Sequence, residues 1–80
     1  MIMALLKRSL RLSGHRTSVA LETEFWTALD EIARLRGLSM PRLLALIEEA
    51  RVREAPDANL ASAARVYALK HSPPRLTKWL

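Results

Sequence analysis

The sequence lacks cysteine entirely and has few glycines and few aromatic residues among its 80 positions. Without cysteine, no disulfide can stabilise the small core, and the commonest sets of zinc ligands are excluded. The two histidines, His15 and His71, are far apart, so we expect no metal site. A chain of this size without disulfides commonly gains buried surface by oligomerising. The absence of cysteine also fits a cytoplasmic location.

The sequence also lacks the residue constellations that catalysis requires. Its two glycines, Gly14 and Gly37, cannot make a glycine-rich phosphate loop. Glu48 and Glu49 are neighbours in a helical pattern and point apart, and neither histidine has a serine or cysteine at motif spacing. We therefore expect no enzymatic activity and no cofactor.

Long hydrophobic runs are absent as well. No stretch approaches the roughly 20 apolar residues that a membrane-spanning helix needs. Residues 1–6 are mostly apolar, but charged residues follow them without a small-residue cleavage pattern. We therefore expect neither a membrane span nor a signal peptide, and a cytoplasmic protein.

Positive charge is concentrated at the two ends of the chain. The formal net charge is +5, and all eight acidic residues lie between Glu22 and Asp57. Residues 1–16 and residues 60–80 contain lysine and arginine but no acidic residue. Basic ends around a near-neutral middle are typical of a chain that binds a polyanion such as nucleic acid, although solubility alone is the alternative.

The segment 16–21 alternates between two kinds of side chain. One face would carry Thr17, Val19 and Leu21, and the other face Arg16, Ser18 and Ala20. A period of two with β-branched residues predicts a half-buried strand. Its backbone needs a hydrogen-bonding partner. Either residues 10–12 fold back on it through a turn at Ser13-Gly14, or the same strand of a second chain pairs with it.

The pattern changes to a helical period after Glu22. Apolar residues at helical spacing predict helices over residues 23–36, 40–53 and 60–71. Gly37 is expected to end the first helix, and Ser39 and Asn59 are expected to cap the next two. The sequence therefore predicts one short strand followed by three helices, a mainly α fold.

These segments resemble the ribbon-helix-helix domain, whose superfamily includes the Arc and methionine repressors. The resemblance rests on Arg16–Glu22, Phe25-Trp26, Leu38-Ser39 and the apolar helix 43–47. Gly14-His15-Arg16-Thr17-Ser18 and the segment from Asn59 to Leu69 are similar to a small bacterial branch with an added third helix. We accordingly divide the chain into a basic arm (1–13), a core (14–54), a third helix (55–71) and a mobile tail (72–80).

The resemblance implies an intertwined homodimer whose paired strands enter the major groove of double-stranded DNA. Its base-contacting residues would be Arg16, Ser18 and Ala20, of which Ala20 can touch a thymine methyl but cannot donate a hydrogen bond. Phosphate contacts are expected from Ser39, Met40 and Arg42 at a helix start, and from Lys7, Arg8 and Arg11 in the arm. The dimer core would comprise Thr17, Val19, Leu21, Phe25, Trp26, Leu29, Ile32, Leu43, Leu44 and Ile47.

The function expected on these grounds is that of a sequence-specific transcriptional regulator, a repressor of nearby genes. The alternative is a protein-interaction module, such as an antitoxin or assembly adaptor, that would bind a second protein through the third helix and the tail.

Overall fold

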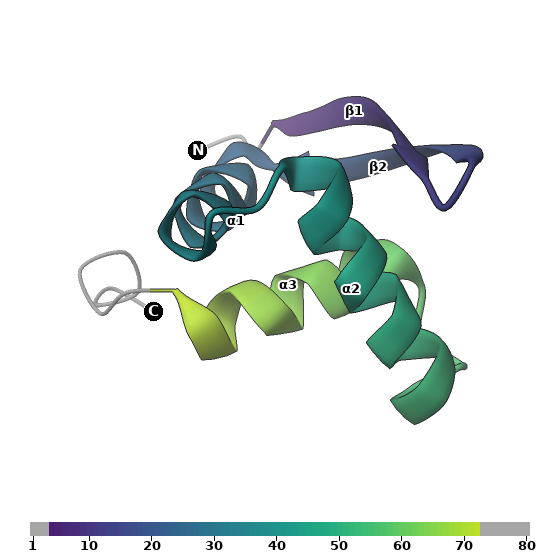
Figure 1. Ribbon diagram of the computed structural model, residues 1–80. Helices are drawn as coiled ribbons and strands as arrows, with labels where there is room; N and C mark the ends of the chain where they lie inside the picture. Colours follow the sequence, from purple (N-terminus) through teal and green to yellow (C-terminus); the bar gives the residue numbers. More distant parts are fainter. Residues whose placement is uncertain (1–3, 73–80) are drawn as a thin grey trace.

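The computed structural model describes residues 4–72, which form a two-stranded sheet followed by three helices (Figure 1). The strands are β1 (Leu5–Leu12) and β2 (His15–Glu22). The helices are α1 (Thr23–Arg36), α2 (Met40–Glu54) and α3 (Leu60–His71). The ribbon-helix-helix fold and the three helices are confirmed, with α2 one residue longer than predicted. The expected tail, apart from Ser72, lies outside the described residues.

The two strands form an antiparallel hairpin within one chain. Ser13 and Gly14 connect them with φ angles of 51° and 84°, and a type I′ turn needs positive φ at both positions. Residues 5–12, which were expected to belong to a basic arm, thus form a strand, and the pairing of β2 with the same strand of a second chain stays a prediction. The structure shows the hairpin alternative, in which β1 forms backbone hydrogen bonds with one edge of β2.

A charged residue in the middle of β1 obscured the length of this strand, of which the sequence pattern indicated only residues 10–12. Arg8 interrupts the apolar alternation, yet it lies on the face of the hairpin that packs on α1. Its guanidinium donates to both carboxylate oxygens of Asp30 at 3.1 Å and lies 4.3 Å from the centre of the Trp26 ring. The indole N–H of Trp26 donates to the Leu6 carbonyl at 2.7 Å. These contacts fasten β1 to α1.

Each helix boundary has a local cause. Gly37 adopts a left-handed conformation after α1, where the Leu38 N–H donates to the Ala33 carbonyl at 2.8 Å and the Gly37 N–H to the Arg34 carbonyl at 3.2 Å. This pair of bonds is the Schellman motif. Side-chain oxygens cap the other two helices: Ser39 accepts from the Arg42 N–H at 3.2 Å, and Asn59 accepts from the Ser62 N–H at 2.8 Å.

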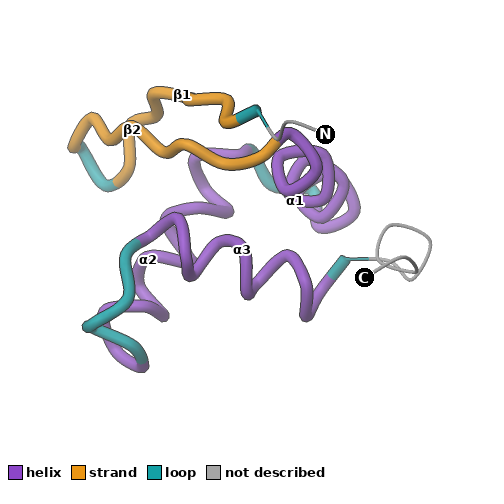
Figure 2. Tube along the Cα trace, turned by 180° about the vertical axis from the view of Figure 1, so that it is seen from behind, coloured by secondary structure: helices purple, strands orange, loops and turns teal. Residues whose placement is uncertain are grey.

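The three helices cover one face of the hairpin and leave the other face open (Figures 1 and 2). Eight of the residues predicted for the dimer core are buried between hairpin and helices in this single chain: Val19, Leu21, Trp26, Leu29, Ile32, Leu43, Leu44 and Ile47. Thr17 and Phe25 are half-buried. Ala64 and Ala68 of α3 are also buried, since small side chains let α3 approach closely. One chain therefore buries this core without a partner.

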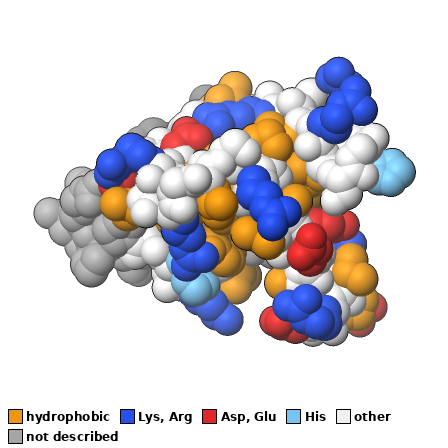
Figure 3. Space-filling model, viewed as in Figure 1, with side chains coloured by type: hydrophobic (Ala, Val, Ile, Leu, Met, Phe, Trp, Pro, Cys, Tyr) orange, Lys and Arg blue, Asp and Glu red, His pale blue; other side chains and the backbone are white. Residues whose placement is uncertain are grey.

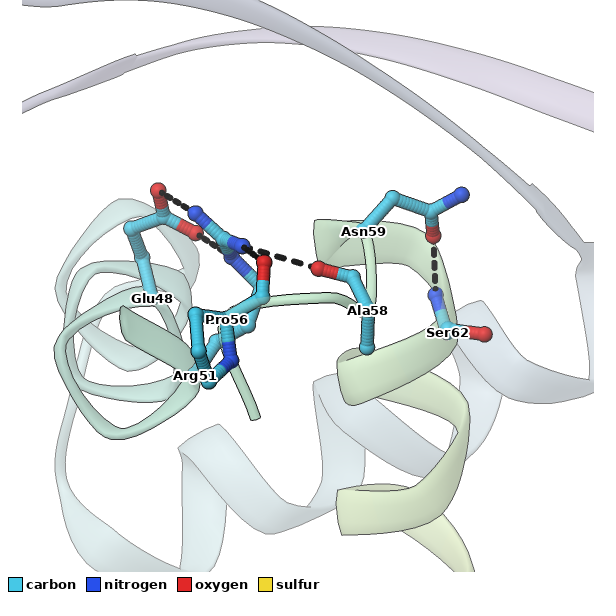
Figure 4. A network of polar contacts seen from close by, with 6 residues as sticks. All are labelled: Glu48, Arg51, Pro56, Ala58, Asn59 and Ser62. Atoms are coloured by element: carbon cyan, nitrogen blue, oxygen red, sulfur yellow. Dashed lines mark hydrogen bonds and ion pairs between the residues drawn. The ribbon is translucent and has the colours of Figure 1, made fainter. Parts of the chain in front are cut away.

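A polar network holds the turn between α2 and α3 (Figure 4). Arg51 donates to both carboxylate oxygens of Glu48, at 2.7 and 3.0 Å, and to the carbonyls of Pro56 and Ala58, at 3.3 and 2.8 Å. The hydrogen bonds between Arg51 and Glu48 lower the pKa of Glu48 and raise that of Arg51. The network fixes where α3 begins, and so places Ala64 and Ala68 in the core.

Candidate nucleic-acid interface

The open face of the hairpin carries three cross-strand pairs of mostly polar side chains. In the register of the sheet, Arg11 is opposite Arg16, Ser9 is opposite Ser18, and Lys7 is opposite Ala20. All are exposed except Ala20, which is half-buried. We call these six residues the outer ribbon face. They alternate along each strand with the residues that face the helices, because successive side chains of a strand point to opposite sides.

Hydrogen bonds on the outer ribbon face leave its cations largely free. The hydroxyl oxygens of Ser9 and Ser18 are 3.2 Å apart and share a hydrogen bond. Arg11 donates a long hydrogen bond of 3.4 Å to the Gly14 carbonyl in the turn. Among the residues that the structure describes, no carboxylate forms an ion pair with Lys7, Arg11 or Arg16. Three cations are thus free to meet an anion.

Glu22, at the end of β2, is the nearest acidic residue in sequence to this face, and its charge is compensated. Arg65 of α3 donates to both Glu22 carboxylate oxygens, at 2.8 and 3.1 Å. The hydrogen bonds from Arg65 lower the pKa of Glu22, so the carboxylate stays ionised and paired. The outer ribbon face therefore carries three basic side chains and no acidic one, and Figure 3 shows lysine and arginine side chains along the top of the molecule, over the hairpin.

The expected phosphate-binding helix start has few free donors. Within the first turn of α2, Pro41 has no N–H, and the N–H groups of Arg42 and Leu43 already donate to Ser39. Met40 packs its side chain against the core, which leaves only its N–H for an anion. The Arg42 side chain is exposed and in no ion pair with a described residue. Arg42 is thus the strongest anion-binding group here.

The structure therefore sorts the site residues predicted from the sequence. Arg16, Ser18 and Ala20 share one face with Lys7 and Arg11, which come from the segment expected to be an arm. Arg8 points to the opposite face, where Asp30 and Trp26 occupy its guanidinium, so the structure argues against its expected phosphate contact. Sequence reasoning missed Ser9, although its alternation with Arg11 carried the signal.

Residues 4–72 show neither a candidate metal site nor a membrane-spanning helix. No group of three or more histidine and acidic side chains in this range could hold a metal ion. No helix in the same range has the length and apolar character that crossing a membrane would need.

Comparison with known proteins identifies the domain. A family model described as the ribbon-helix-helix domain matches residues 5–72, which include both strands and all three helices. The solved structure of an uncharacterized protein from Bordetella pertussis Tohama I is similar, with 39% sequence identity and a TM-score of 0.72. The match covers 85% of this chain and 55% of that one, so this chain spans about half of its length. A search of curated proteins found no match. The chain belongs to the ribbon-helix-helix domain family.

Proposed function

We propose that this protein is a DNA-binding transcriptional regulator that inserts its hairpin into the major groove. The observation that carries this proposal is the outer ribbon face, an exposed two-stranded surface with three cations that form no ion pair within residues 4–72. A two-stranded ribbon fits the major groove, whose edges distinguish all four base pairs. Ribbon-helix-helix domains are typically non-enzymatic regulators, which agrees with this assignment.

In this proposal one set of residues contacts the bases and gives sequence specificity, and another set contacts phosphates and gives affinity. Arg16 would bond guanine, Ser18 would bond either base edge, and Ala20 would contact a thymine methyl. Lys7 and Arg11, together with Ser39, Met40 and Arg42 at the start of α2, would contact phosphates. Counterion release at these contacts would supply most of the affinity at low salt.

We further propose that two copies act together as a homodimer on a palindromic or tandem site. Ribbon-helix-helix proteins typically bind DNA as dimers. Since β1 pairs with one edge of β2, each copy would present its own hairpin, and the intertwined pairing expected from the sequence would have to use the other edge of β2. A dimer on a promoter would repress the genes beside it by occlusion, acting on the chromosome in the cytoplasm.

The direct test is a salt titration of binding to a mixed-sequence duplex, followed by fluorescence anisotropy. We expect the logarithm of the association constant to fall steeply with the logarithm of salt concentration. The control variant Arg53→Ala removes one positive charge from the far end of α2 and should leave the slope unchanged. No binding to any duplex even at low salt would refute the proposed function.

A second candidate function, a protein-interaction module, is favoured by an apolar groove between α2 and α3. Leu46, Ala50, Ala63, Val66 and Tyr67 are among the residues that line it. Arg36, Lys70 and His71 also line it, against one acidic residue, Glu54, so the matching partner would be an acidic amphipathic segment of another protein. The variant Val66→Asp should keep DNA affinity under the first function. Loss of regulation in cells, with DNA affinity intact, would favour the second.

A further inference from the structure

Two arginines of one chain stand side by side near the tip of the hairpin. Arg11 of β1 is the direct cross-strand partner of Arg16 of β2, and both are exposed on the outer ribbon face. They lie next to the type I′ turn at Ser13-Gly14, which holds both strands in a fixed register. The pair is thus a pre-organised feature of a single chain.

Like charges that face each other across a hairpin destabilise it. No described acidic residue relieves this repulsion, because the carboxylates that form ion pairs in residues 4–72 do so with other arginines. Within the described residues, the guanidinium groups of this pair make one hydrogen bond, from Arg11 to the Gly14 carbonyl, and it is long at 3.4 Å. Both guanidinium groups therefore keep most of their donors free, and an electronegative ligand at the tip would remove the repulsion.

We propose that Arg11 and Arg16 together read two guanines, an inference that rests on the proposed function. In this arrangement β1 supplies half of the base-reading surface. A guanidinium donates two parallel hydrogen bonds to guanine O6 and N7 in the major groove. Arg11 thereby becomes a specificity-determining residue instead of a phosphate contact. Ser9, whose hydroxyl is hydrogen-bonded to that of Ser18, joins the reading surface at the next level of the ribbon.

The spacing of the ribbon predicts the shape of the recognised element. Two residues along a strand advance about 6.8 Å, which is roughly two base-pair steps of DNA. The serine pair would therefore lie about two base pairs from the arginine pair. Lys7 and Ala20 would lie about four base pairs from it, where Ala20 would favour a thymine. Each chain would read an element of about five base pairs with its guanines at the end under the turn.

The test is a random-duplex selection with sequencing, run on the wild type and on Arg11→Ala, Arg11→Lys and Arg16→Ala. Arg53→Ala is the matched control, since it removes an arginine outside the ribbon. We expect the wild type and the control to select two guanines. Each arginine variant should lose one of them, with about a tenfold or greater drop in preference over other bases at that position. Arg11→Lys keeps the charge but loses the bidentate bond, so it should lose the same guanine.

The outcomes separate this proposal from the proposed function. If the wild type selects a site and Arg11→Lys selects the same site, Arg11 does not read a base, while the proposed function still holds. If the wild type selects no site, the proposed function fails and this proposal fails with it. Folding of each variant is checked by circular dichroism. If Arg11→Ala alters the hairpin, Arg11→Lys replaces it as the variant that decides the test.

Discussion

Arg8 and Arg11 are three residues apart on β1 and lie on opposite faces of the hairpin. Arg8 is bound by Asp30 and stacks on Trp26, whereas Arg11 is exposed and its positive charge has no described counterion. The two residues contribute equally to the net charge, so charge alone does not distinguish them. Because side chains alternate along the strand, Arg8 stabilises the fold, whereas Arg11 is available to a binding partner.

A matched pair of substitutions tests this division. Arg8→Ala should lower the free energy of unfolding by about 1 kcal/mol, because it removes a cation–π contact and an ion pair. It should leave the salt slope of DNA binding nearly unchanged. Arg11→Ala should do the reverse, with little effect on urea unfolding and a shallower salt slope. Equal effects of both variants on DNA binding would contradict the assignment of faces.

The ion pair of Glu22 makes the free energy of unfolding depend on pH. Its pKa is lowered in the folded chain, first by the hydrogen bonds from Arg65. A carboxylate with a lowered folded pKa stabilises the fold fully above its unfolded pKa, about 4.3, and loses this contribution as the pH falls through the folded pKa. Glu22→Gln should therefore be less stable than the wild type at neutral pH. In urea unfolding curves this difference should shrink below about pH 4; a constant difference would argue against the Arg65 contact.

At the scale of elements, the hairpin turn fixes the register that creates the outer ribbon face. Gly14 has a φ of 84°, and an added Cβ there would meet no atom within 4 Å, so any cost of Gly14→Ala comes from the backbone alone. We expect a loss of about 1–2 kcal/mol in the free energy of unfolding. Ser13→Asn should act in the opposite direction, since asparagine accepts positive φ more readily than serine. Thermal unfolding of both variants measures this contrast.

The elements also show what the sequence could and could not predict. Helix bounds followed from apolar spacing and from local signals such as Gly37, Ser39 and Asn59, because these act within a few residues. The partner of β2 did not follow, since the turn at Ser13-Gly14 allowed both a hairpin and a second chain. Only the contact of Arg8 with Asp30, 22 residues apart, explains a charge on the inner face of β1.

At the scale of the whole molecule, one chain completes its own core. Leu21, Leu29 and Leu44 are 0% exposed without a second chain, because the hairpin and the helices of the same chain bury them. The residues predicted as a dimer core could be recognised as apolar from the sequence. Whether a second chain or the same chain buries them depends on the tertiary arrangement, which apolar spacing does not encode.

This arrangement predicts that folding does not depend on assembly. The melting temperature should stay constant over a hundredfold range of protein concentration, whereas that of an intertwined dimer would rise with concentration. Leu29→Ala should lower the free energy of unfolding by about 2–5 kcal/mol, because it leaves a cavity in the shared core. A concentration-dependent melting temperature would show that the isolated chain is not the folding unit.

Guanine methylation interference on the selected duplex tests most directly whether the outer ribbon face enters the major groove. Guanine N7 lies in the major groove, whereas adenine N3 lies in the minor groove. We predict that methylation at N7 of the selected guanines blocks binding by the wild type, and that Arg16→Ala becomes insensitive at one of them. Interference confined to adenine N3, with no effect at guanine N7, would contradict this mode of binding.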